Sequence, residues 1–336
     1  AEKHWGHVAK PLGSLGVLEE DIVRAAAAQG EEVPDFSRRA LLIFCADNGV
    51  VKEGVSQTGQ EVTAAVVSNM TRGRSCSCLM AEKAEADVFP IDMGIACEVE
   101  HRGELYPLTE RKIRRGTSNF TKAAAMTRQE VLTAILTGID AVRVLKEQGY
   151  RLSAVGEMGI GNTTTSSAVA SVLLQKDPEL VTGAGAGLDS AGLKRKTEAI
   201  RRGIGLHHPD PMDGMEVLQK VGGFDLAAMA GAFLGGAIYH VPVVIDGVIA
   251  AAAAAAAGRI APAATDYMLA AHVSAEPASI WLLDLIGVTP AIQAGLRLGE
   301  GTGALALFPL LDMALSIYRD MDTFAEMEIE EYKPLV

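Results

Sequence analysis

The chain has 336 residues, of which 49% are hydrophobic and 21% charged, with 35 glycines and few aromatic residues. This length can bury a sizeable core, and the composition is typical of α/β enzymes. A formal net charge of −12 argues against nucleic acid as the main partner, although local basic groups can still hold one phosphate. Four cysteines fit no metal spacing. These cysteines are therefore predicted to be reduced thiols, and no metal is expected. Residues 1–5 are polar and no apolar run is long enough for a membrane span, so a cytoplasmic protein is predicted.

Short apolar runs that end at a polar or acidic residue recur along the chain. Uninterrupted apolar runs are typical of strands that are buried on both faces, as in a parallel sheet. Ligands bind beyond the carboxyl ends of such strands, so these ends are predicted to line one crevice. The runs are 40–46, 86–91, 152–155, 241–245 and 267–273, and the residues that follow them include Asp47, Asp92, Glu157, Asp246 and Glu276.

Helical patterns separate the apolar runs. Thr127 and Glu130 form a capping box, and residues 60–80 and 188–202 are also predicted helices. The alternation predicts an α/β fold with a Rossmann-like parallel sheet and helices on both faces. Residues 18–29 and 305–332 have helical patterns as well. We therefore expect a small helical domain from residues 1–30 and 305–336, and a large α/β domain from 31–304.

The segment 156–165 follows the third apolar run and precedes a helix of small residues. It contains a carboxylate, then two glycines, an amide and three hydroxyls. Glycines let backbone N–H groups approach a ligand closely, and a helix N-terminus favours an anion. The segment predicts a phosphate site with Glu157 at its edge, formed by Gly159, Gly161, Asn162, Thr163 and Thr164.

A second glycine cluster, residues 183–187, precedes a helix that carries Lys194 and Lys196. A glycine-rich turn followed by basic residues also suits an anion. It is not a Walker loop, because Leu193 stands where that motif needs lysine. A flexible turn followed by a solvated basic helix face remains an alternative interpretation.

A third cluster places Glu300 between Gly299 and Gly301. Glycines in this pattern indicate a close approach, and a carboxylate held in such a place can act as a general base. A solvated loop glutamate remains the alternative. His272 lies on an apolar run and is interpreted as a core histidine, and His207 as a surface or capping residue.

Several segments together carry a resemblance to a known family: 10–16, 47–50, 54–56, 60–63, 157–164, 187–189, 195–196, 274–277 and 298–301. In this order they resemble the nicotinate-nucleotide–dimethylbenzimidazole phosphoribosyltransferase family over nearly the full length. The resemblance implies transfer of phosphoribose from nicotinate mononucleotide to 5,6-dimethylbenzimidazole or a related base, for assembly of the cobamide nucleotide loop. It implies no cofactor and a dimer, either a homodimer or a heterodimer with a paralogue.

The resemblance also implies roles for individual residues. Glu300 matches the family's general base, and Glu157 and Lys196 match other active-site residues. The loops with Gly159–Thr164 and with Gly185 and Gly187 match those that hold phosphate and ribose. The remaining implied residues line the nicotinate and base pocket: Ser274, Leu298 and Gly299.

Two segments depart from the family pattern. Residues 247–250 read Gly-Val-Ile-Ala where the family commonly has Gly-Phe-Ile-Ser, and 122–127 lack the usual proline. The choice of base is therefore open among benzimidazoles, purines and phenols. A nucleoside hydrolase-type enzyme and a non-catalytic paralogous subunit are the alternative functions.

Overall fold

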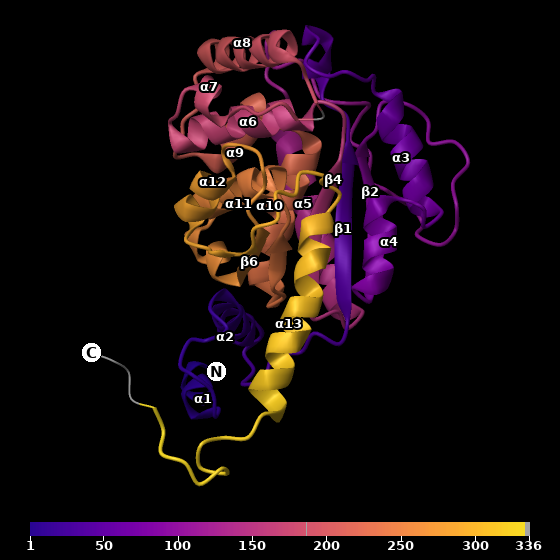
Figure 1. Ribbon diagram of the computed structural model, residues 1–336. Coiled ribbons are helices and arrows are strands. Elements are labelled where there is room, and N and C mark those ends of the chain that lie inside the picture. Colours follow the sequence, from indigo (N-terminus) through magenta and orange to yellow (C-terminus); the bar gives the residue numbers. More distant parts are fainter. Residues whose placement is uncertain (186, 333–336) are drawn as a thin grey trace.

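The computed structural model describes residues 1–185 and 187–332 (Figure 1). Within them the strands form one seven-stranded sheet of order β3-β2-β1-β4-β5-β6-β7, with neighbouring strands parallel. The order reverses between β1 and β4, as in a Rossmann-like sheet. This confirms the predicted fold class. The strands are β1 (Arg39–Ala46), β2 (Ala86–Gly94), β3 (Thr109–Glu110), β4 (Leu152–Met158), β5 (Val243–Ile245), β6 (Met268–His272) and β7 (Pro290–Ile292).

Helices cover both faces of the sheet (Figure 1). Side chains alternate along a strand, so Leu42 and Phe44 of β1 face one core while Leu41 and Ile43 face the other. The core on one face is shared by α5 (Arg128–Glu147), α6 (Asn162–Leu174), α8 (Ser190–His207), α9 (Gly214–Val221), α10 (Phe224–Tyr239), α11 (Val248–Ile260) and α12 (Ser279–Ile286), of which α8, α9 and α12 pack mainly on the other helices. The other face packs against α3 (Glu61–Thr71), α4 (Cys76–Lys83) and α13 (Thr302–Asp320). Three short helices complete the fold: α7 (Pro178–Val181), η1 (Gly49–Glu53) and η2 (Pro262–Tyr267).

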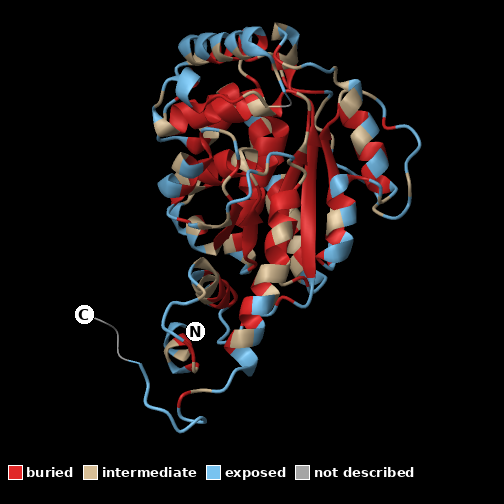
Figure 2. Cartoon of the chain, viewed as in Figure 1, coloured by how far each residue is buried: buried red, intermediate tan, exposed pale blue. Residues whose placement is uncertain are grey.

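The alanine run of the sequence lies within α11. Its residues 250–257 are all buried, because α11 is enclosed by α10, α6, α12 and α9 (Figure 2). Alanine side chains allow these helices to approach closely. Among the described residues, no helix is both long enough and apolar enough to cross a membrane.

Two helix predictions were wrong in extent. Residues 60–80 form two helices instead of one, because the chain turns at Gly73 with φ of 69° and Ser75 caps the new helix α4. The helix predicted for 305–332 ends at Asp320, and Met321 is extended. Nothing in the sequence indicated β3 and β7, which are two and three residues long at the sheet edges.

The two chain ends pack together at one end of the molecule. The helices α1 (Glu2–His7) and α2 (Val17–Gln29) lie near the C-terminal part of α13 (Figure 1). Trp5 meets Tyr318 edge-on, with ring centroids 4.9 Å apart, and Val8 forms an antiparallel bridge with Thr323. The boundaries proposed for a small domain, 1–30 and 305–336, stay a prediction, and residues 333–336 lie outside the described part.

Candidate active site

A cavity of about 350 Å³ lies at the carboxyl edge of the sheet. It is lined by the ends of β4, β5 and β6 and by the loop that precedes α13. Most residues predicted for the site border it: Glu157, Gly159, Asn162, Thr163, Gly185, Ser274, Leu298, Gly299 and Glu300. The fold thus brings the three glycine clusters of the sequence together.

Four predicted residues do not border the cavity. Gly161 adopts φ of 97° and caps α6, and Thr164 is buried within the first turn of that helix. Lys196 lies behind Thr163. The carbonyl of Gly187 accepts a hydrogen bond from the Gln57 side chain, and Ala186 beside it lies outside the described residues.

One end of the cavity suits an anion. The N-terminus of α6 opens there, and a helix N-terminus favours an anion. The N–H groups of Asn162 and Thr164 donate to the carbonyls of Gly159 and Gly161, which leaves the Thr163 N–H for a ligand among the described residues of this turn.

Lys196 is fully buried, and its Nζ donates to Thr163 Oγ1 at 3.1 Å and to the Gly183 carbonyl at 3.0 Å. Burial lowers the Lys196 pKa to about 8, while Glu276 opposes the shift. A phosphate in this place would meet the N–H and hydroxyl groups of Thr163, with the Lys196 cation directly behind that hydroxyl.

Glu276 also borders this end, although the sequence alone indicated no role for it. Its Oε1 accepts a hydrogen bond from the Gly185 N–H at 3.2 Å, so it holds the glycine turn that precedes α8. The one signal for it was its position just after the fifth apolar run. The alternative of a solvated basic face applies to Lys194, which is exposed, and not to Lys196.

Glu157 lies at the end of β4 and is 7% exposed. Its Oε2 accepts a hydrogen bond from Asn162 Nδ2. Burial raises its pKa well above the ordinary value, and the nearby carboxylates of Asp225, Asp246 and Glu300 add to that shift. The loop before α13 passes very close, because a Cβ on Gly299 would lie 2.7 Å from Glu157 Oε1.

Glu300 borders the other end of the cavity. Its Oε2 accepts hydrogen bonds from Ser77 Oγ at 3.0 Å and from the Ser77 N–H at 3.5 Å, in the first turn of α4. Burial raises the pKa of Glu300, the Ser77 bonds oppose that shift, and Asp246 adds to it. A carboxylate that is oriented and has a raised pKa is suited to accept a proton.

Ser77 was not predicted from the sequence, because α4 was merged into one long helix with α3. Asp246 and His272 also border the cavity, and their side chains lie 3.7 Å apart. His272 was interpreted as a core residue, and it is indeed 4% exposed. The remaining wall is largely apolar: Val62, Val66, Val248, Ile249 and Ala250.

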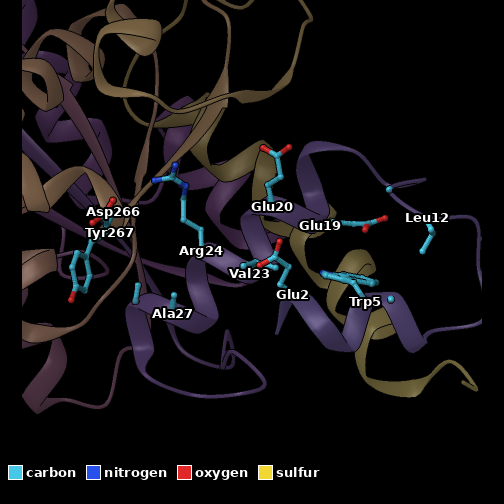
Figure 3. A pocket seen from close by; sticks show the side chains of 13 residues that line it. Glu2, Trp5, Leu12, Glu19, Glu20, Val23, Arg24, Ala27, Asp266 and Tyr267 are labelled. Carbon is cyan, nitrogen blue, oxygen red and sulfur yellow. The ribbon is translucent and has the colours of Figure 1, made fainter. Parts of the chain in front are cut away.

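A larger hollow of about 990 Å³ lies between α1, α2 and η2 (Figure 3). Most of its charged side chains are acidic: Glu2, Glu19, Glu20 and Asp266. Its Arg24 donates to the carbonyls of Thr265 and Gly287, both at 3.0 Å. The smaller cavity is the better candidate, because it lies at the carboxyl edge of the sheet, where the three glycine clusters meet. In the described part of the chain, no group of three or more His, Cys, Asp or Glu residues could hold a metal ion.

The fold and the cavity define an α/β enzyme whose cavity joins the N-terminus of α6, with a buried lysine behind it, to two glutamates of raised pKa. The phosphoribosyltransferase family model matches residues 1–329, and the chain belongs to this family.

Similar proteins extend over the whole chain. A nicotinate-nucleotide–dimethylbenzimidazole phosphoribosyltransferase of Ruminiclostridium cellulolyticum is 45% identical over 335 residues, which cover 100% of this chain and 94% of that protein. One from Clostridium acetobutylicum is 44% identical, covering 99% and 94%. The crystal structure of CobT from Thermus thermophilus matches with a TM-score of 0.91 at 39% identity, covering 98% of this chain and 97% of that one.

Proposed function

We propose that this protein transfers phosphoribose from nicotinate mononucleotide to 5,6-dimethylbenzimidazole or a similar apolar base. The products are nicotinate and an α-ribotide for the cobamide nucleotide loop. The observation that carries the proposal is the pairing, in one cavity, of the anion site near Lys196 with the Glu300 carboxylate held by Ser77. The names of the full-length relatives support the same reaction.

The anion end is proposed to hold the 5′-phosphate of the nucleotide. The N-terminus of α6 supplies the Thr163 N–H and a favourable dipole, and the Thr163 hydroxyl is contacted by Lys196. A hydrogen bond to a charged group contributes about 1.5–3 kcal/mol. Because the phosphate does not react, this binding energy fixes the ribose relative to the two glutamates.

The leaving group needs no acid. Nicotinate in the nucleotide is a pyridinium, so it departs from C1′ as a neutral ring nitrogen. Positive charge then gathers on the ribose, and a nearby carboxylate stabilises it. We assign this role to Glu157. Burial favours its neutral form, and the cationic pyridinium ring of the nucleotide would favour the carboxylate.

The acceptor base must lose a proton. One ring nitrogen of a benzimidazole attacks C1′ while the other ring nitrogen gives up its N–H proton. Glu300 is proposed to take that proton as a general base. Attack on the face opposite the leaving nicotinate gives the α configuration directly. A phenolic acceptor would offer an O–H to the same carboxylate.

The apolar wall supports a benzimidazole over a purine. Val62, Val66 and Val248 offer no hydrogen-bond partner to an exocyclic amino group, and an unpaired buried polar group costs about 1–3 kcal/mol. Methyl groups of the base would instead gain from burial. Val248 stands where the family commonly has phenylalanine, which leaves more room for substituents on the ring. A dimer and a cytoplasmic location are proposed on the family resemblance alone.

The purified protein tests this function when it is incubated with nicotinate mononucleotide, alone and with single acceptor bases. Chromatography follows nicotinate release and ribotide formation. We expect nicotinate release only with an acceptor, one α-ribotide for each nicotinate, and higher kcat/KM for 5,6-dimethylbenzimidazole than for adenine. Release without an acceptor would indicate a hydrolase, and no release with any acceptor would indicate a non-catalytic subunit.

A further inference from the structure

Asp246, at the end of β5, binds the backbone of the loop that carries Glu300. Its Oδ1 accepts hydrogen bonds from the N–H groups of Gly303 at 2.7 Å and Ala304 at 3.1 Å. Its Oδ2 accepts one from the Gly301 N–H at 3.1 Å. These donors belong to the start of α13, where N–H groups have no partners within the helix. Asp246 is 4% exposed, so water does not compete for these bonds.

The loop that Asp246 binds has an uncommon backbone conformation. Gly299, Glu300 and Gly301 have φ values of 87°, 58° and 80°, all in the left-handed region. A side chain disfavours that region, so Glu300 stays there only if its surroundings hold it. Asp246 fixes the backbone on the C-terminal side of Glu300, and Ser77 fixes its carboxylate. Glu300 is thus held at two separate points.

His272, at the end of β6, packs against both Asp246 and the start of α13. Its Nε2 lies 3.7 Å from Asp246 Oδ1, and its side chain is almost fully buried. The ring also packs on the start of α13, because a Cβ on Gly303 would lie 2.0 Å from His272 Cδ2. Asp246 from β5 is the charged group nearest to His272, and Glu157 from β4 and Glu300 border the same cavity.

We propose that Asp246, with His272 packed against it, is a positioning residue that holds Glu300 for proton transfer. This role depends on the proton-accepting function of Glu300 proposed above. Both oxygens of Asp246 accept from backbone N–H groups. Asparagine cannot accept hydrogen bonds at both positions, because its NH₂ group is a donor and would face one of these backbone N–H donors. The loop would then lose one attachment while the anion end of the cavity kept its contacts.

The test is a double-mutant cycle of Asp246→Asn and Glu300→Gln, with kcat, nicotinate mononucleotide KM and melting temperature measured for each protein. We expect Asp246→Asn to lower kcat about 10- to 100-fold, since misplacing a reacting group by 1 Å can cost that much. The nucleotide KM should stay within about 3-fold. In the Glu300→Gln background the same change should cost less than about 3-fold in kcat, because residues that act as a unit are not additive.

Asp213→Asn is the matched control. Asp213 is an exposed aspartate that caps α9, where it accepts from the Glu216 N–H at 2.9 Å, so the change removes a similar helix contact away from the cavity. Its kcat should equal that of the unchanged protein. If Asp246→Asn does not fold, His272→Gln takes its place in the cycle, with an expected 3- to 10-fold fall in kcat, on the order of a small misplacement.

Equal kcat losses in both backgrounds would overturn the positioning role, as would a raised nucleotide KM with unchanged kcat. Unchanged turnover in Glu300→Gln alone would instead overturn the proposed base, and the positioning role with it. The two failures are therefore distinguishable.

Discussion

The two ends of the cavity are built in different ways. The anion end comes mostly from one continuous segment, in which β4 ends, a glycine turn follows and α6 begins. The proton-transfer end is assembled from residues far apart in the chain, with Ser77 and Glu300 separated by 223 positions. The first uses backbone geometry that a short motif encodes, and the second uses side chains that tertiary packing brings together.

Because they are built differently, the two ends should control different properties, namely nucleotide binding and turnover. In the proposed function, the N-terminus of α6 and Lys196 hold a phosphate in the ground state and in the transition state alike, so they should affect binding. The proposed base Glu300 acts on a proton that moves only during the reaction, so it should affect turnover.

Glu300→Gln should lower kcat about 10²- to 10⁴-fold, the usual contribution of a general base. Glutamine keeps the shape of the side chain and cannot accept the proton. The dissociation constant of nicotinate mononucleotide, measured by calorimetry, should change by less than about 3-fold. Glu179→Gln, at an exposed position of α7, is the matched control and should leave kcat unchanged. A large loss of affinity with full turnover at saturation would place Glu300 in binding instead.

Lys196→Met should raise the nucleotide KM about 10- to 100-fold, because it removes a charged hydrogen-bond donor of about 1.5–3 kcal/mol. The unchanged enzyme should lose kcat/KM as the pH rises through about 8, where the lysine gives up its proton. This fall of kcat/KM at alkaline pH should be missing in Lys196→Met. Lys194→Met, on the exposed side of the same helix, is the control. Unchanged KM in Lys196→Met would remove the lysine from the anion site.

Ser77→Ala should shift the acidic limb of the kcat/KM profile to higher pH. The Ser77 bonds stabilise the charged carboxylate and so oppose the rise of the Glu300 pKa. Without them the pKa rises further, and a larger share of Glu300 is protonated at a given pH. The plateau kcat should fall about 3- to 10-fold as the carboxylate loses its orientation. Ser316→Ala, exposed on α13, controls for loss of a hydroxyl. A limb that moves to lower pH would contradict the account.

Val248→Phe should have the smallest effect, confined to the choice of acceptor. The larger ring would narrow the cavity at its apolar wall, so kcat/KM for 5,6-dimethylbenzimidazole should fall relative to unsubstituted benzimidazole by about 3-fold. The nucleotide KM should not change. An equal effect on both acceptors would mean that position 248 does not contact the methyl groups.

The segment that forms the proposed anion end was visible in the sequence because its signals are local. The strand end at Glu157 and the glycines at 159 and 161 lie within ten residues. The helix that was predicted to follow residue 165 begins earlier, at Asn162, because Gly161 with φ of 97° provides its N-cap. Lys196 was less certain, since spacing alone does not distinguish a buried lysine from the exposed Lys194 beside it.

The proton-transfer end was only partly predictable. Glu300 was marked by its neighbouring glycines, whose positive φ values explain why glycine is needed there. Ser77 was missed because Gly73, which ends a helical segment, was read as part of a continuous helix. Asp246 was visible as a strand end, but its three bonds to the loop before α13 depend on packing that no periodicity reveals.

The most direct test of the division between the two ends compares Glu300→Gln with Lys196→Met in one set of measurements. Nucleotide affinity is measured by calorimetry, and a single turnover is measured at saturating nucleotide and base. The account predicts near-normal affinity with slow turnover for Glu300→Gln, and weak affinity with a much smaller loss of saturated turnover for Lys196→Met. Equal losses of affinity and turnover in both variants would contradict it.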